Sequence, residues 1–265
     1  MRNMIYKSVA SSKIPMIIFC YRNMLFLIVV LLGLVSSSCK NQVNEHANPS
    51  SSSSSIEPEL EVVDDVIVAQ VIDYDTTMWT EITEDSGVVL DLRYATDNNF
   101  TEKQIYDCDR CFLRPELAHK MLQLQQEINN RYGYSLKMFD CYRPRPYQQR
   151  LWDIVPDARY VTPPKKGSMH NRGLAVDITL VDADGNELDM GTDFDHFGYK
   201  AYSNNTNLPE EVLKNRKVLS KLMNIHGLKG IRTEWWHYSL RSGQALKNGT
   251  APLDSWVWDC PPSDI

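Results

Sequence analysis

The feature that most constrains this fold is a pair of short motifs that together offer the ligands of one metal ion. The first, SMHNRGLAVD, contains His170 and ends at Asp177, and the second, EWWHY, begins at Glu234 and contains His237. Two imidazoles, one carboxylate ligand and a spare glutamate match a catalytic zinc site, which has three protein ligands and an open position for water. Neither motif contains a cysteine, which usually closes a structural zinc site. The pair therefore predicts a catalytic metal.

Each of these residues also has an ordinary structural interpretation. A histidine near a glycine is often a satisfied loop residue, Asp177 could end a strand, and the two tryptophans could belong to the core. The conjunction favours the metal, because the chain has only six histidines and two of them lie in motifs that also carry an acid.

The spacing of the second motif predicts an irregular strand if its acid and its histidine serve one site. Residues 174–181 are rich in Val, Ile and Leu and predict a buried strand that carries Asp177, with His170 on the loop before it. Glu234 and His237 are three positions apart in an aromatic run that also predicts a strand. An odd offset on a regular strand places two side chains on opposite faces. If both residues serve one site, the backbone must bulge or turn there.

Residues 1–38 are expected to be a signal peptide. They carry four basic and no acidic side chains, and their apolar run, Met24–Val35, is shorter than a membrane-spanning helix. The run leads into three serines and Cys39, which resembles a bacterial lipoprotein cleavage site with Cys39 as the lipidated first residue. An ordinary cleaved signal and an uncleaved anchor are the alternatives.

The segment 39–59 is expected to be a flexible tether. It is polar and contains the unbroken serine run Ser50–Ser55, and such a composition cannot bury a core. Residues 60–265 then form one catalytic domain of sufficient size for its own core. We expect membrane contact only through the lipid anchor, and export to the periplasm or outer surface.

The charge of the chain excludes one class of partner. Its net charge is −6, and without the four basic residues of 1–38 it is −10. An acidic domain without a basic stripe is a poor partner for nucleic acid.

Four cysteines remain in the domain: Cys108, Cys111, Cys141 and Cys260. Zinc binding by the Cys108-x-x-Cys111 pair would need a second such pair, and the sequence has none. An exported protein can form disulfides, so one or two are expected. Four cysteines allow three complete pairings, which the sequence does not distinguish.

The pattern of the domain predicts an α+β fold, an antiparallel sheet with helices packed around it. Helices are expected from Pro115 to Gly133, with Leu117, Met121, Leu124 and Ile128 on one face, over 147–154, and from Pro209 to Gly227. Strands are expected over 62–72, 88–94, 136–139, 174–181 and 234–238, with 187–190 pairing back as a hairpin after a turn at 184–186.

These motifs resemble a known family. Ser168-x-His170, Gly173-x-Ala175-x-Asp177 and Glu234-x-Trp236-His237 are similar to the motifs of the zinc D-alanyl-D-alanine peptidases, which share a fold with the Hedgehog signalling domain. The segment DLRYATDNNFT over 91–101, the run DCYRP over 140–144 and the doubled tryptophan narrow the resemblance to the VanX-type dipeptidases. The resemblance spans about residues 88–241.

The resemblance implies a role for each motif residue. His170, Asp177 and His237 would bind one zinc ion per chain, and Glu234 would be the base that activates the zinc-bound water. Two imidazoles and one carboxylate leave the zinc with a charge near +1, which lowers the pKa of bound water toward about 7. Arg143 would stabilise the tetrahedral intermediate.

Two further positions, Asp140 and Ser168, match residues near the substrate. The sequence departs from the family pattern where glycine is usual, at Glu102 and at Cys141. The second departure places a thiol or a disulfide next to the proposed catalytic arginine.

The expected activity is therefore hydrolysis of D-alanyl-D-alanine or related D-dipeptides by an exported zinc metallopeptidase. The alternatives are a carboxypeptidase or endopeptidase acting on peptidoglycan stem peptides, and a non-catalytic wall-binding lipoprotein. Segments 97–112 and 191–208 are long enough to form lids over a small pocket, which favours the dipeptidase. Glu234 argues against the non-catalytic alternative, because a structural metal site has no use for an unligated base.

Overall fold

The computed structural model describes residues 72–249 and 251–261. The expected signal peptide, Cys39, the tether and residues 62–71 of the first expected strand lie outside this part, and Ile72 is not in a strand. Among the described residues, no helix has the length and apolar character needed to cross a membrane.

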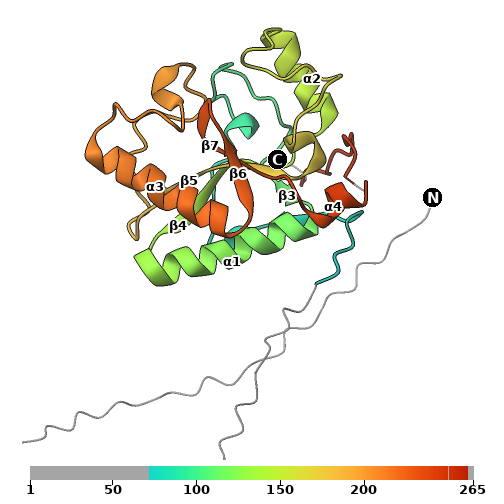
Figure 1. The fold of residues 1–265 in the computed structure, drawn as a ribbon. Helices are drawn as coiled ribbons and strands as arrows, with labels where there is room; N and C mark the ends of the chain where they lie inside the picture. The colour runs from blue at the N-terminus through green and yellow to red at the C-terminus, as the bar shows by residue number, and fades with distance from the viewer. Residues whose placement is uncertain (1–71, 250, 262–265) are drawn as a thin grey trace, which may run out of the picture. The chain divides into compact units, whose positions relative to one another are not determined.

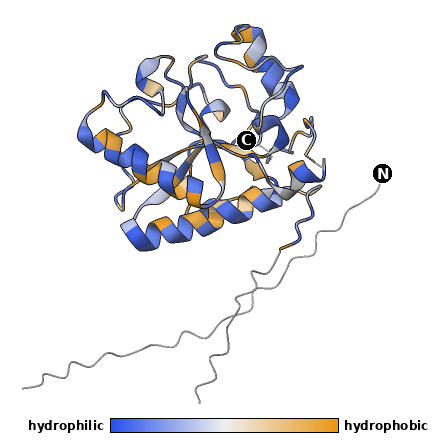
Figure 2. Ribbon diagram, viewed as in Figure 1, coloured by the Kyte–Doolittle hydropathy of each residue, from blue (hydrophilic) through white to orange (hydrophobic). Residues whose placement is uncertain are grey.

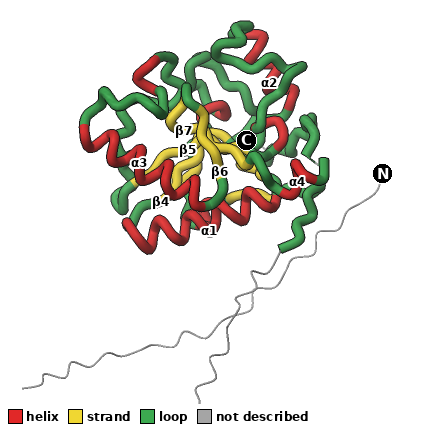
Figure 3. The backbone as a smooth tube through the Cα atoms, in the orientation of Figure 1, coloured by secondary structure: helices red, strands yellow, loops and turns green. Residues whose placement is uncertain are grey.

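A five-stranded sheet forms the centre of the domain (Figures 1 and 3). Its strand order is β2 (Val89–Leu90), β4 (Ser135–Asp140), β5 (Ala175–Val181), β7 (Glu234–Leu240) and β6 (Leu228–Ile231). A separate antiparallel pair joins β1 (Thr80–Ile82) to β3 (Cys111–Leu113). Because β2 runs parallel to β4 while the other pairs are antiparallel, the sheet is mixed. The α+β prediction is confirmed, and the expected antiparallel sheet has one parallel pair, at this edge.

Two long helices, α1 (Pro115–Tyr132) and α3 (Glu210–Ile225), lie next to each other along one side of the sheet (Figure 1). Figure 2 shows hydrophobic and hydrophilic residues alternating along both, as expected of helices with one buried face. The predicted apolar residues of α1 are fully buried: Leu117, Met121, Leu124 and Ile128. Gly133 ends α1 with a φ of 67°, which L-residues adopt only with strain.

The shorter helices lie outside this pair. The helix α2 (Arg145–Ile154) follows β4 by way of a short loop, and α4 (Gln244–Lys247) follows β7. The structure confirms the predicted helices over 147–154 and after Pro209, with α2 beginning two residues earlier than expected.

Two strand predictions are wrong in part. The expected strand 88–94 ends at Leu90, and Arg93–Ala95 forms a 3₁₀ helix instead. The carbonyl of Tyr94 accepts hydrogen bonds from the amides of both Ile105 and Tyr106, so the chain folds back on itself there. The hairpin over 187–190 is reduced to a bridge between Val181 and Glu187 and one hydrogen bond from the Leu188 amide.

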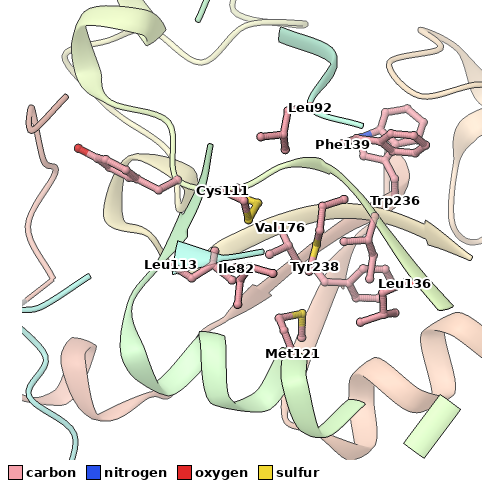
Figure 4. Packing of buried hydrophobic residues seen from close by; sticks show 14 of the residues in the cluster. Ile82, Leu92, Cys111, Leu113, Met121, Leu136, Phe139, Val176, Trp236 and Tyr238 are labelled. Carbon is pink, nitrogen blue, oxygen red and sulfur yellow. A yellow bond between two sulfur atoms is a disulfide. The ribbon is translucent and has the colours of Figure 1, made fainter. Parts of the chain in front are cut away.

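Two of the candidate ligands project from the face of the sheet opposite α1. Figure 4 shows Leu136, Val176 and Tyr238 on the side of the sheet that meets Met121 of α1. Because successive side chains of a strand point to opposite faces, the neighbours of Val176 and Tyr238 in their strands point away from α1. Asp177 and His237 are those neighbours, so both project from the opposite face.

All four domain cysteines are paired. Cys108 bonds to Cys260 near the C-terminus, and Cys111 of β3 bonds to Cys141, directly after β4. The structure thereby selects one of the three pairings that the sequence left open.

Candidate active site

Three adjacent strands align the central residues of the site. Asp140 of β4 is opposite Asp177 of β5, and Asp177 is opposite His237 of β7. A register shift in β4 separates Met138 from Asp140, so Phe139 is the extra residue of a bulge. Bulges of this kind re-aim side chains next to active sites.

The predicted metal ligands converge. His170, Asp177 and His237 each offer one ligand atom, and these atoms lie within 4.8 Å of one another. The Oδ1 atom of Asp177 lies 2.9 Å from Nδ1 of His237 and 3.3 Å from Nε2 of His170. The two imidazole nitrogens are 3.1 Å apart. All three side chains are almost completely buried.

The orientation of His170 indicates which of its nitrogens is free to bind a cation. His170 begins a 3₁₀ helix, His170–Arg172, that precedes β5. Its Nδ1 lies 2.7 Å from the carbonyl oxygen of Cys141, and since a carbonyl can only accept, Nδ1 carries the proton. In the neutral ring, Nε2 then presents its lone pair to Asp177 and His237. A backbone carbonyl that fixes the tautomer in this way is a common partner of metal-binding histidines.

Glu234 lies next to the candidate ligands because β7 is irregular. In the pairing of β6 with β7, Gly230 is opposite Tyr238 but Ile231 is opposite Glu234, so the register shifts between these two pairs. The prediction of a bulge in the second motif is confirmed. Oε2 of Glu234 lies 3.9 Å from Nδ1 of His237. Burial raises the pKa of Glu234 above its ordinary 4.5, with Asp177 adding to the rise and His237 opposing it.

Arg143 is held rigidly at the edge of the site. Its Nε and Nη2 donate to Oδ2 of Asp140 over 3.1 and 2.6 Å, and its Nη1 donates to Gln148 over 3.1 Å. Burial alone would lower the pKa of Arg143, but Asp140 and two tyrosines, Tyr106 and Tyr94, hold it well above its ordinary value. Three of the five N–H groups of the guanidinium are used in these bonds, and two are left for a ligand.

The two residues predicted to lie near substrate have different positions. Ser168 lines the pocket, and its amide donates to Oδ1 of Asn171. Asp140 is fully buried and lies behind Arg143, where its carboxylate also accepts hydrogen bonds from the Tyr106 hydroxyl and the Cys141 amide.

Asn171 joins two loops of the site and was not among the residues predicted from the sequence. Its Nδ2 donates to the carbonyl of Arg143 over 2.7 Å, while the amide of Arg143 donates to the carbonyl of His170. The position of Asn171 next to His170 is the only signal for it in the sequence.

The residues surround a pocket of about 170 Å³. The three candidate ligands, Glu234, Arg143 and Ser168 all line it, together with Tyr94, Tyr160 and Asp195 among others. The pocket is small compared with drug-sized sites, which are about 300–1,000 Å³.

Asp195 is a second acid in the pocket that the sequence analysis did not identify. Its backbone φ is 56°, a conformation that is uncommon for residues other than glycine and that concentrates at functional sites. Its Oδ2 accepts a hydrogen bond from the Tyr94 hydroxyl over 2.7 Å. Burial raises the pKa of Asp195 well above 3.8, and the nearby charges of Asp177 and Glu234 add to the rise.

Aromatic rings from three loops meet beside the pocket. Phe197 contacts Tyr160 with ring centroids 4.3 Å apart and Phe100 with centroids 5.0 Å apart. Segment 191–208 supplies Asp195 and Phe197, and segment 97–112 supplies Phe100, so both expected lid segments contribute to this side of the site. The loop after α2, which supplies Tyr160, was not predicted to take part.

Comparisons with known proteins identify the family of this chain. A sequence model of the M15 peptidases, described as D-Ala-D-Ala dipeptidase, matches residues 77–252. The D-alanyl-D-alanine dipeptidase of Escherichia coli (strain K12) is 38% identical over 151 residues, which cover 57% of this chain and 78% of the relative. That of Enterococcus faecium is 32% identical over 176 residues, covering 58% of this chain and 87% of the relative. The D-alanyl-D-alanine dipeptidase of Enterococcus faecalis (strain ATCC 700802 / V583) is 29% identical over 178 residues, covering 58% of this chain and 86% of the relative.

Proposed function

This chain belongs to the M15 peptidase family of D-Ala-D-Ala dipeptidases, and we propose that it hydrolyses the peptide bond of D-alanyl-D-alanine or closely related D-dipeptides. The observation that carries the proposal is the convergence of His170, Asp177 and His237 in a small pocket that also holds Glu234 and Arg143. A structural metal site would need neither the unligated acid nor the cation.

The ligands fit one zinc ion. Two imidazole nitrogens and a carboxylate oxygen are donors that zinc accepts, and three protein ligands are typical of catalytic rather than structural sites. A bound zinc ion would act as a Lewis acid, increasing the acidity of water and polarising the substrate carbonyl. The carbonyl of Cys141 orients His170, and the register of β5 with β7 places Asp177 beside His237.

Glu234 is the general base in this proposal. It lines the pocket next to His237, and the irregularity of β7 turns it toward the ligands. It takes the proton of the attacking water and then delivers it to the leaving amine. A correctly placed base of this kind contributes about 10²–10⁴-fold to the rate.

Arg143 stabilises the oxyanion that develops during the attack. Asp140, Gln148 and Tyr106 hold the guanidinium in place before substrate arrives, so no reorganisation is needed during the reaction. We assign Asp140 to positioning Arg143 rather than to contact with substrate, because its carboxylate is fully buried behind the arginine.

The pocket favours a dipeptide over the wall polymer. Asp195 offers a carboxylate to the free ammonium of a dipeptide, a group that an internal peptide bond lacks. Tyr160 and Phe197 contact each other next to Asp195, and this contact narrows the space into which a longer peptide would have to extend. These features support a dipeptidase over the alternative carboxypeptidase or endopeptidase.

Product analysis tests the proposal. Purified protein loaded with zinc is incubated separately with D-Ala-D-Ala, L-Ala-L-Ala and muropeptides that end in D-Ala-D-Ala. We expect free D-alanine from the first substrate only. Release of terminal D-alanine from muropeptides at a comparable rate would show a carboxypeptidase, and no hydrolysis of any substrate would refute the proposed function.

The Glu234→Gln variant identifies the base within the same assay. It should retain zinc and lose about 10²–10⁴-fold in turnover. The matched control is Glu210→Gln on the exposed first turn of α3, which should keep the wild-type rate. A Glu234→Gln variant with full metal content and a near wild-type rate would exclude Glu234 as the base.

We also propose that the enzyme is exported and anchored by lipid at Cys39. The two disulfides support export, because such bonds persist mainly in oxidising compartments. In a bacterial host, Cys39→Ser should release the protein from the membrane fraction. Continued association with membranes would favour an uncleaved anchor over Met24–Val35.

A further inference from the structure

The Cys111–Cys141 disulfide lies directly against the candidate metal site. The carbonyl of Cys141 accepts a hydrogen bond from Nδ1 of His170, and the amide of Cys141 donates to Oδ1 of Asp140 over 2.9 Å. The backbone of Cys141 thus contacts both the proposed metal ligand His170 and Asp140, the residue that binds Arg143. The third attachment of Cys141 is its bond to Cys111.

The other end of this disulfide is firmly held. Cys111 belongs to β3, which pairs with β1, and it is completely buried, as is nearly all of Cys141. The carbonyl of Phe112 accepts a hydrogen bond from the Tyr142 amide over 2.9 Å. The disulfide and this hydrogen bond together tie the chain that follows β4 to β3.

We propose that the Cys111–Cys141 disulfide is a positioning element of the active centre. It holds the Cys141 carbonyl at the place where it orients His170 toward the metal, and it holds the backbone that leads from Asp140 to Arg143. Outer partners of a metal-binding histidine typically contribute about 10- to 100-fold to metal affinity. The inference rests on the proposed function, since it requires His170 to be a metal ligand.

The second disulfide provides a matched control. Cys108 and Cys260 do not line the pocket, and Cys260 is exposed. The two cysteines are separated by 152 residues, against 30 for Cys111 and Cys141. In the chain-entropy model a longer closed loop restricts the unfolded chain more, so removing Cys108–Cys260 should cost more stability.

The test compares the double variants C111A/C141A and C108A/C260A with the wild type. Zinc affinity is measured by competition with a chromophoric chelator, stability by thermal unfolding of the zinc-free proteins, and turnover at saturating zinc. We expect C111A/C141A to bind zinc about 10- to 100-fold more weakly and to turn over more slowly even when saturated. C108A/C260A should lose more thermal stability but keep wild-type zinc affinity.

Two results would overturn the inference. One is wild-type zinc affinity in C111A/C141A, and the other is an equal loss of affinity in both variants, which would indicate general loosening of the fold. If C111A/C141A does not fold, C111V/C141A replaces more of the lost volume and is measured in the same way. Failure of the proposed function is seen separately, because the wild type would then bind no zinc or release no D-alanine.

Discussion

Substitution of Gly173 by alanine should be among the most damaging small changes in the domain. Gly173 lies between the 3₁₀ helix that carries His170 and the strand that carries Asp177, and it has a φ of 67°. A Cβ added there would lie 2.3 Å from the Cζ3 atom of Trp79. That ring cannot easily move, because it packs on Tyr142 at 4.0 Å.

The structure provides a control with the same strain and no clash. Gly133 also has a φ of 67°, but a Cβ added there would meet nothing within 4 Å. The left-handed conformation costs an L-residue about 1–2 kcal/mol. Overpacking in a filled site adds about 1–3 kcal/mol. We therefore expect a loss of about 1–2 kcal/mol for Gly133→Ala and about 2–5 kcal/mol for Gly173→Ala. The effect of alanine on the entropy of the unfolded chain is common to both and cancels.

Urea unfolding of the two variants, monitored by circular dichroism, measures the difference. In thermal unfolding, 1 kcal/mol corresponds to about 2–4 °C for a domain of this size. Gly173→Ala should also weaken zinc binding, since it displaces the loop between two of the proposed ligands, whereas Gly133→Ala should not. Equal destabilisation by the two substitutions would refute the reasoning, because it would mean that the Trp79 contact has no cost.

Substitutions at three other positions test separate parts of the structure. Arg143→Ala should lower kcat and kcat/KM together with little change in KM. Arg143→Lys should restore only part of this activity, because a point charge cannot reproduce the guanidinium fork. A rise in KM alone would instead assign Arg143 to ground-state binding of the substrate. Tyr160→Ala should increase cleavage of a tripeptide relative to D-Ala-D-Ala, and an unchanged ratio would show that this ring does not limit substrate length. Burial favours a high pKa for Asp91, but hydrogen bonds from Lys137 and an arginine hold it below 3.8, so Asp91→Asn should lower stability at neutral pH. That difference should be fully present above pH 3.8 and disappear as the pH falls through the depressed pKa, and a difference independent of pH would exclude the charge as its cause.

The sequence predicts best those features that depend on neighbouring residues. The face of α1 from Leu117 to Ile128 follows from helical spacing, and its end follows from Gly133. The break in β7 was expected because Glu234 and His237 could share a site only if the strand were irregular. In each case a short stretch of chain contains both the signal and its consequence.

Features that depend on contacts between distant segments were not predicted. Asp195 becomes part of the site through contacts with distant segments, such as the hydrogen bond from Tyr94, which lies 101 positions earlier in the chain. The choice of partner for Cys141 depends on β3, which was not among the strands expected from the sequence. The parallel pairing of β2 with β4 likewise could not be predicted from the residues of β2 alone.

The separation of the proposed metal ligands along the chain has a thermodynamic consequence. His170 and His237 are 67 positions apart and meet only when β5 and β7 are paired, so the unfolded chain has no equivalent site. A ligand that binds only the folded state stabilises it in proportion to the logarithm of its free concentration, and zinc at a thousand times its Kd would contribute about 4.1 kcal/mol. Through this linkage the zinc supply would govern how long the folded enzyme persists, as well as whether it is active. A chelator would therefore shorten the lifetime of the central sheet in addition to stopping hydrolysis.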